Sequence, residues 1–213
     1  MRAAHSITAL LLLATAFGAQ AQLQDTQGTA FENEFVRVTR NAAPCGPAGT
    51  AGCGERVLVA MGPMGLRAGN AERRVAYGDI LVFAANESYQ PEPGARFFEV
   101  MVKAGHPPAR GPAEVIGAEN NQPVHDSARF FIYEEKLPVG AIRTRHSHAQ
   151  RIEIRMSQGP QLQQRIWREA GRDSPSIVNE APIVNWREPM IHEVRNTGDQ
   201  PLRNFILEFK PGR

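Results

Sequence analysis

The sequence predicts an all-β protein built from two similar halves. Sixteen prolines and nineteen glycines are spread over 213 residues, a composition that favours short strands joined by turns. The apolar stretches are short, and several alternate with polar residues, as in Phe35–Thr39 (FVRVT). This alternation is the period of a strand with one buried face. No long stretch has the periodicity of a helix, and the strand-like stretches of the first half recur in order in the second.

Four strands are expected in the first half. They are the FVRVT stretch, ERVLVAM at 55–61, the part of VAYGDILVFA (75–84) that follows its Gly-Asp turn, and ARFFEVMVK at 95–103. Residues 106–123 are rich in glycine, proline, alanine and asparagine, and they are interpreted as a linker. The predicted units are therefore residues 22–105 and 124–213.

The second half repeats the first. ARFFIY at 128–133 corresponds to FVRVT, and QRIEIRM at 150–156 corresponds to ERVLVAM. IVNW at 183–186 corresponds to ILVF at 80–83, and RNFILEFKPG at 203–212 corresponds to RFFEVMVKAG at 96–105. An internal duplication of an all-β unit explains this ordered series. Units of this length close as sandwiches or jelly-roll barrels. The strands VLVAM and IEIRM are apolar on both faces, so one face would line a barrel and the other would pack on the second unit or on another subunit of a homo-oligomer.

The first 21 residues have the pattern of a secretory signal peptide. Arg2 begins a short basic region, Ile7–Phe17 is apolar, and Ala19-Gln20-Ala21 resembles a cleavage site. The apolar run is too short to span a bilayer comfortably. A periplasmic or secreted protein is predicted, with no membrane association after cleavage because no other stretch is long and apolar enough.

The two cysteines, Cys45 and Cys53, are the only pair in the chain. In an oxidising compartment a disulfide between them is expected, and the flexible GPAGTAG between them makes closure easy. Two thiolate metal ligands are the alternative, but no third cysteine or nearby histidine supports it.

The formal net charge of +2 is too small to indicate nucleic acid as a partner. The candidate chemistry lies in GAIRTRHSHAQRIE, residues 140–153. His146 and His148 are two residues apart, so on a strand they point to the same face. Glu153 follows, and His192 comes about forty residues later. Imidazoles and a carboxylate brought together can bind a metal ion.

These residues resemble the motifs of the cupin superfamily. Gly140, five residues, His-x-His, four residues, Glu153 and then Gly159 resemble the first cupin motif, and His192-x-x-x-Asn196 resembles the end of the second. The proline-x-glycine that usually precedes the latter histidine is shortened here. The resemblance implies tandem jelly-roll barrels, a bicupin, with one intact motif in the C-terminal barrel.

The resemblance also implies one divalent first-row transition metal, Fe, Mn, Ni, Co, Cu or Zn. Its ligands would be His146, His148, Glu153 and His192. The first half lacks this set of ligands, since residues 51–54 correspond to the histidine pair and Leu58 corresponds to Glu153. The N-terminal barrel is therefore expected to be a metal-free scaffold.

Two alternatives stay open around Glu153. It lies between Ile152 and Ile154, and if the isoleucines faced the barrel interior, Gln150 would be the polar group nearest the site. If Glu153 faces inward, Arg155 shares its face and could bind an anionic substrate; an ion pair at the barrel mouth is the other interpretation.

Three neighbouring roles are also predicted. Arg143 and Arg145 alternate with the histidines and should point away from them. Asn196 should shape a turn.

Three functions are compatible with these features. The first is a metal-dependent enzyme acting on a small organic substrate, with a dioxygenase as the most populous kind among cupins with this ligand set. The second is a non-catalytic exported protein that binds a small ligand or a metal. The third is a metal-free assembly module. The sequence assigns no catalytic residue.

Overall fold

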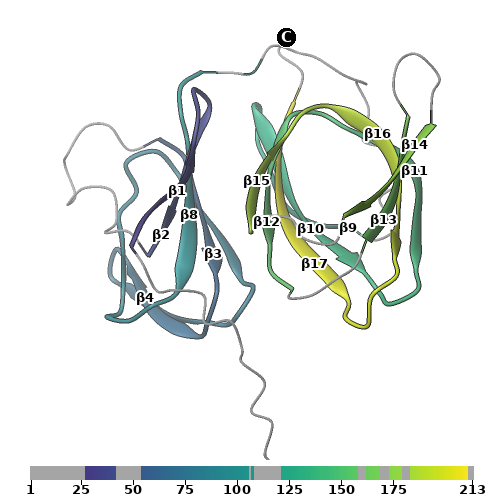
Figure 1. Ribbon diagram of the computed structural model, residues 1–213. Helices are drawn as coiled ribbons and strands as arrows, with labels where there is room; N and C mark the ends of the chain where they lie inside the picture. The colour runs from purple at the N-terminus through teal and green to yellow at the C-terminus, as the bar shows by residue number, and fades with distance from the viewer. Residues whose placement is uncertain are drawn as a thin grey trace, which may run out of the picture.

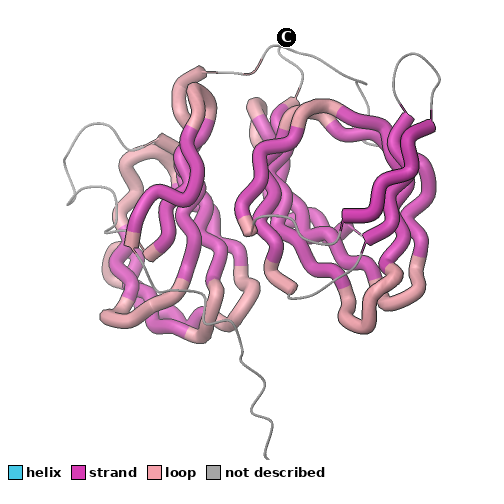
Figure 2. The backbone as a smooth tube through the Cα atoms, viewed as in Figure 1, coloured by secondary structure: helices cyan, strands magenta, loops and turns pink. Residues whose placement is uncertain are grey.

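The computed structural model describes residues 27–41, 54–105, 107, 121–157, 162–167, 173–178 and 183–210. These ranges contain seventeen strands and no helix. Figures 1 and 2 draw the described chain as strands and loops. The strand pairs are all antiparallel. The prediction of an all-β fold is therefore confirmed. The predicted signal peptide, the two cysteines and most of the predicted linker lie outside the described residues.

The first half forms two sheets. Its strands are β1 (Gly28–Glu32), β2 (Val36–Arg40), β3 (Arg56–Ala60), β4 (Met64–Ala68), β5 (Ala71–Val75), β6 (Ile80–Phe83), β7 (Tyr89–Pro91) and β8 (Phe97–Val102). A five-stranded sheet has the order β1-β2-β8-β3-β6, and a three-stranded sheet has the order β5-β4-β7. The short strands β4, β5 and β7 were not predicted. In β5 (AERRV) the first four residues are exposed, so this strand lacks the alternation that marks a half-buried strand.

The second half also forms two sheets. Its strands are β9 (Asn121–Asp126), β10 (Phe130–Leu137), β11 (Ile142–His148), β12 (Arg151–Arg155), β13 (Leu162–Trp167), β14 (Asp173–Val178), β15 (Val184–Arg187), β16 (Met190–Asn196) and β17 (Leu202–Phe209). The sheets have the orders β15-β12-β17-β10-β9 and β11-β16-β13-β14. In Figure 1 these strands curve around a common interior.

The strand order of one half matches that of the other. Replacing β1, β2, β8, β3 and β6 by β9, β10, β17, β12 and β15 converts the first large sheet into the second. In the same chain order, β5, β4 and β7 of the small sheet correspond to β14, β13 and β16 of the second half. Only β11, the strand with the two neighbouring histidines, has no counterpart in the described part of the first half. By chain order its counterpart would fall in residues 42–53, which lie outside the described ranges.

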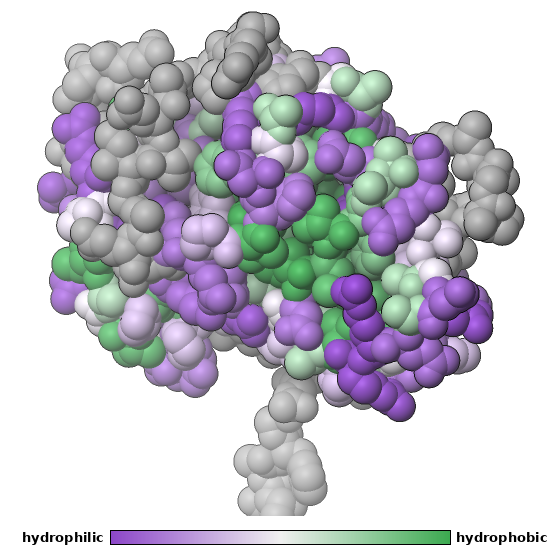
Figure 3. Space-filling view, turned by 180° about the vertical axis from the view of Figure 1, so that it is seen from behind, coloured by the Kyte–Doolittle hydropathy of each residue, from purple (hydrophilic) through white to green (hydrophobic). Residues whose placement is uncertain are grey.

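The largest apolar core lies between the two five-stranded sheets, one from each half. Val57 and Val59 of β3 are fully buried there together with Ile152 and Ile154 of β12. Strands β3 and β12 therefore bury one face against the other half, as their apolar sequences predicted. On the face seen in Figure 3, apolar residues gather in the middle, with hydrophilic residues around them.

Aromatic and polar contacts extend this junction. Trp186 stacks on Phe35, with ring centroids 5.8 Å apart. The Tyr77 hydroxyl donates a hydrogen bond to the main-chain oxygen of Met156. Since each contact joins the first half to the second, the halves are held by a shared core rather than by the connecting chain alone.

The interiors of the two halves differ. The first is filled by apolar side chains, including Leu58, Met64 and Leu66. The second has a small apolar cluster of Leu137, Val194 and Leu202 and, beside it, many buried polar groups. Buried polar groups are costly unless paired, so the second interior is the place to look for a site. Within the described ranges, no helix is long and apolar enough to cross a membrane.

Candidate metal centre

Three histidines meet on the adjacent strands β11 and β16 in the second half. His146 and His192 are directly paired across these strands, and His148 follows His146 on the same face. All three side chains are at most 5% exposed. Pairing across an antiparallel ladder brings side chains to about 5 Å, so residues that are more than forty positions apart in sequence become neighbours.

A β-bulge lies just before the histidines, between Arg143 and His146. An extra residue in one strand shifts the alternation of side chains between faces. Arg143 is consequently buried and forms an ion pair with buried Glu135. The prediction that Arg143 points away from the histidine face on strict alternation is wrong, because the bulge changes the parity.

Each of the three histidines brings one ring nitrogen to the same place. One ring nitrogen from each histidine lies within 4.8 Å of the others, and Nε2 of His146 is 3.0 Å from Nε2 of His148. Two nitrogens that bind one ion with bonds of about 2.1 Å at a right angle are about 3.0 Å apart. Nε2 of His192 is buried and has no hydrogen-bond partner among the described residues. The spacing and the orphaned nitrogen both fit a bound cation.

The opposite ring nitrogen, Nδ1, is held in each histidine by an oxygen. The partners are the main-chain oxygen of Thr144 for His146 (2.6 Å), Oε2 of Glu208 for His148 (3.0 Å) and Oε1 of Gln164 for His192 (3.3 Å). A carbonyl, a carboxylate and an amide oxygen are acceptors, so the tautomer with the proton on Nδ1 satisfies all three contacts. Each Nε2 then presents a lone pair, and lone pairs 3.0 Å apart repel unless a cation or a proton lies between them. Orientation of metal-binding histidines by such outer partners is general in metal sites.

Glu208 is the residue of this site that the sequence analysis missed. It is fully buried, and it accepts hydrogen bonds from the Tyr133 hydroxyl (2.9 Å) and from the main-chain N–H of Ala149. Burial raises the pKa of Glu208. A glutamate is almost never buried unless it is paired, so one glutamate inside the apolar strand FILEF was a signal that could have been used.

The imidazoles are held neutral. Burial, followed by the charge of Arg143, lowers the pKa of His146 to about 4. Burial, followed by the charge of Arg151, lowers the pKa of His148 well below its usual value, and burial has the same effect on the pKa of His192. Neutral imidazole is the form that binds metal ions, so the site keeps its donors available over a wide pH range.

These shifts predict how the stability of the metal-free protein depends on pH. Between the folded pKa of His146, about 4, and its ordinary value near 6.5, the unfolded chain binds more protons than the folded chain. The free energy of unfolding should therefore be fully retained above pH ~6.5 and should fall as the pH is lowered toward 4. Urea unfolding at pH 5.0–6.5 measures this slope. His146→Gln should make the slope shallower by up to about 1.4 kcal/mol per pH unit; an unchanged slope would contradict the prediction.

The remaining predicted site residues lie around the histidines. Glu153 lines a cavity that His148 and His192 also line. It accepts a hydrogen bond from Arg187, with Nε 3.4 Å from Oε2, and its carboxylate is not part of the cluster of possible ligands formed by the three histidines. Its role as a metal ligand stays a prediction. Since Ile152 and Ile154 pack in the core between the halves, the face of β12 that carries Glu153 is the one turned to the cavity. Gln150 is buried and donates to Glu188 (3.1 Å).

Arg155 and Asn196 complete the set. Arg155 is half-buried, and it is not among the described residues that line the cavity. Asn196 is fully buried; its Nδ2 donates to the main-chain oxygens of Leu137 and Gln200, and its Oδ1 accepts from Gly198 N–H. The prediction that Asn196 shapes a turn is confirmed.

The cavity beside the histidines is small, with about 30 Å³ open to the centres of water molecules. Its lining includes His148, His192, Arg151, Arg187 and Glu153. A volume of this size holds an ion with one or two waters, so a substrate that enters it must be small.

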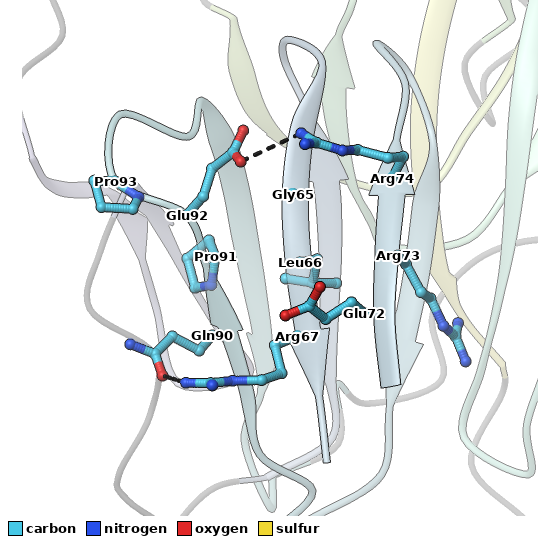
Figure 4. Close-up of a pocket in the computed structure, with 10 residues that line it drawn as sticks. All are labelled: Gly65, Leu66, Arg67, Glu72, Arg73, Arg74, Gln90, Pro91, Glu92 and Pro93. Atoms are coloured by element: carbon cyan, nitrogen blue, oxygen red, sulfur yellow. Dashed lines mark hydrogen bonds and ion pairs between the residues drawn. The ribbon is translucent and has the colours of Figure 1, made fainter. Parts of the chain in front are cut away.

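A larger cavity, of about 380 Å³, lies on the outer face of β4, β5 and β7 in the first half. Figure 4 shows that Arg74 forms an ion pair with Glu92 (3.4 Å) and that Arg67 donates a hydrogen bond to Gln90 Oε1 (2.7 Å). Gly65 makes room for Glu92, since a Cβ there would lie 2.6 Å from its Oε2. The side chains of Arg74 and Glu92 are exposed to solvent, which makes their ion pair weak, so the buried histidine cluster is the stronger candidate site.

Glu208 gives a prediction of its own. Glu208→Gln leaves the shape of the side chain but removes the charged acceptor that holds His148, and loss of such an outer partner lowers metal affinity by about 10–100-fold. Titration of the metal-free protein with Zn²⁺ or Co²⁺ by calorimetry measures the change. Glu188→Gln is the matched control, because Glu188 is exposed and contacts Gln150 and Trp186 rather than a histidine. Equal affinities for the two variants would contradict this role of Glu208.

Antiparallel sheets curved around a buried histidine cluster define the class to which this architecture belongs, the jelly-roll barrels. The sequence matches no family model and no curated protein. The solved structures that it resembles include a cupin barrel domain protein, so the fold is shared with that protein.

Three of these structures show the extent of the likeness. A cupin 2 conserved barrel domain protein from Leptotrichia buccalis has a TM-score of 0.53 at 12% identity, over 87% of this chain and 88% of the other. Oxalate decarboxylase from Bacillus subtilis, in a study of its Mn(II) centres, has a TM-score of 0.52 at 14% identity, over 84% and 70%. AerE from Microcystis aeruginosa has a TM-score of 0.52 at 15% identity, over 83% and 88%. At these identities the likeness concerns the fold.

Proposed function

We propose that the second half binds one divalent first-row transition metal through Nε2 of His146, His148 and His192. The observation that carries this proposal is the convergence of one ring nitrogen from each of three buried histidines, whose Nδ1 atoms all lie beside oxygen acceptors. Glu153 would be the fourth ligand after leaving Arg187. Nitrogen and carboxylate donors suit Fe, Mn, Co, Ni, Cu or Zn, and Mn(II) has a precedent in the oxalate decarboxylase that shares this fold.

We further propose that the protein is a metal-dependent enzyme acting on a small organic substrate, with a dioxygenase reaction as the first to test. The ion would supply Lewis acidity and redox capacity. The chain supplies the rest: the outer partners fix the imidazoles, the buried walls exclude water, and the cavity arginines orient an anionic group. Glu153, when it is not bound to the ion, is placed to accept a proton from a substrate in the cavity.

A non-catalytic metal-binding or ligand-binding protein is the alternative, and the small volume of the cavity favours it, since about 30 Å³ leaves little room for a substrate beside an ion. Oxygen uptake by the metal-loaded protein, measured with a panel of phenolic and keto-acid compounds, separates the two functions. Turnover that is lost in His146→Ala supports the enzyme. A protein that holds stoichiometric metal and turns over none of the panel supports the alternative.

Three further proposals rest on the sequence. Residues 1–21 direct export to the periplasm or the medium, Cys45 and Cys53 form a disulfide there, and the two halves descend from one duplicated barrel. The equal strand order of the halves supports the duplication. Cell fractionation together with mass spectrometry of the unreduced protein tests export, cleavage and the disulfide in one preparation.

A further inference from the structure

Arg151 is a buried cation beside the histidines whose hydrogen-bonding capacity is largely unused. It begins β12, is 3% exposed and lines the cavity. Its Nε and Nη1 atoms are buried without a hydrogen-bond partner among the described residues, and Nη2 has only the Met190 sulfur at 3.5 Å. A thioether is a weak acceptor. A buried guanidinium without hydrogen-bond acceptors is unfavourable, so a bound ligand is expected to supply an acceptor at this position.

The other cavity arginine lacks this property. Arg187 has Glu153 as its partner at 3.4 Å, and neighbouring Arg143 forms an ion pair with Glu135. The charges of these two arginines are therefore already balanced by carboxylates of the chain. Arg151 is paired with Glu208 across β12 and β17, but among the described residues no carboxylate lies within ion-pair distance of its guanidinium.

A second cation near a metal ion is electrostatically unfavourable unless an anion lies between them. An anionic ligand that accepts hydrogen bonds from Arg151 and faces the three imidazoles would remove both penalties together. Because arginine is the side chain best suited to carboxylates, a carboxylate is the simplest such ligand for a cavity of this size.

We propose that Arg151 is the anion-binding residue of the metal cavity and that the substrate or ligand is a small carboxylic acid held by its guanidinium. This inference rests on the metal site proposed above and deepens it by naming the class of ligand. It also moves the predicted anion-binding position from Arg155 to Arg151, four residues earlier on the same face of β12.

The first half provides a matched control. Arg56 begins β3 as Arg151 begins β12, and β3 pairs with β8 as β12 pairs with β17. Arg56 is fully buried, and its Nε and Nη1 are likewise without a partner among the described residues. It faces the ring of Tyr89 rather than a histidine cluster. Equivalent substitutions at the two arginines should perturb folding similarly but should differ in ligand binding.

The experiment compares the purified wild-type protein with Arg151→Gln, Arg151→Lys and Arg56→Gln. Each is loaded with Co²⁺ and titrated with formate and with uncharged formamide, and binding is followed by calorimetry and by the visible spectrum of the ion. We expect formate, but not formamide, to bind the wild type. Arg151→Gln should weaken formate binding by about 10–100-fold, the usual effect of losing a charge-assisted hydrogen bond, while Arg56→Gln should leave it unchanged.

Other outcomes overturn the inference. Equal affinity for formate and formamide, no binding of formate to a folded protein, or equal weakening by Arg151→Gln and Arg56→Gln would each do so. If Arg151→Gln does not fold, Arg151→Lys keeps the charge but loses the planar fork, and it should weaken formate binding. If the wild type takes up no metal, the proposed function fails. Formate titration of the metal-free protein then still decides the inference, because the donors of Arg151 do not depend on the ion.

Discussion

Replacing His148 by alanine is expected to abolish stoichiometric metal binding while leaving the fold in place. The substitution removes the one imidazole whose Nδ1 is held by a buried carboxylate, Glu208, and whose Nε2 lies 3.0 Å from that of His146. Loss of an outer partner alone lowers metal affinity by about 10–100-fold, so loss of the ligand itself should exceed ~100-fold. Metal content by mass spectrometry after dialysis, followed by competition with a chelator, measures the effect.

Two controls make this result specific. His125→Ala removes a histidine from β9, at the edge of the sheet that packs on the first half, and it should leave the metal content unchanged. The circular dichroism spectrum of His148→Ala should remain that of a β protein, because no backbone hydrogen bond depends on the ring. Wild-type stoichiometry retained in His148→Ala would remove this residue from the site and with it the proposed geometry.

The histidine cluster could be predicted from the sequence because strand alternation and register act over short distances. His146 and His148 share a face by their spacing alone. His192 was placed by its resemblance to a family motif, since pairing between β11 and β16 is a long-range event that no local pattern encodes. Its direct pairing with His146 depends on how the barrel closes.

Other parts of the site could not be predicted from local sequence patterns. The bulge that turns Arg143 inward interrupts the alternation on which the prediction for that residue depended. Glu208 lies on the last strand, sixty residues from His148, and the two meet only because β17 runs beside β12. The apolar face that β3 and β12 bury between the halves was, by contrast, readable from sequence, because Val57, Val59, Ile152 and Ile154 alternate along these strands.

Replacing Phe205 by alanine is expected to destabilise the whole described protein rather than one half. Phe205 is fully buried in the core between the two five-stranded sheets, with Val57, Val59 and Ile154 in the same cluster. Truncation of a buried phenylalanine typically lowers the free energy of unfolding by about 3–5 kcal/mol, because a cavity remains that the neighbours fill only in part. Since the cluster draws residues from both halves, the loss should reach strands that do not belong to the mutated half.

Hydrogen exchange detected by mass spectrometry distinguishes destabilisation of both halves from destabilisation of the second half alone. In Phe205→Ala, peptides from β3 and β8 should lose protection together with peptides from β12 and β17, and urea unfolding should remain a single transition at a lower midpoint. Val139→Ala is the matched control, because Val139 is 52% exposed and its truncation should change stability by less than about 0.5 kcal/mol. Loss of protection confined to β12 and β17 would mean that each half unfolds independently and that the shared core contributes little to the stability of the first half. A shared loss would mean that the first half stabilises the sheet on which Arg151 and Glu208 are carried.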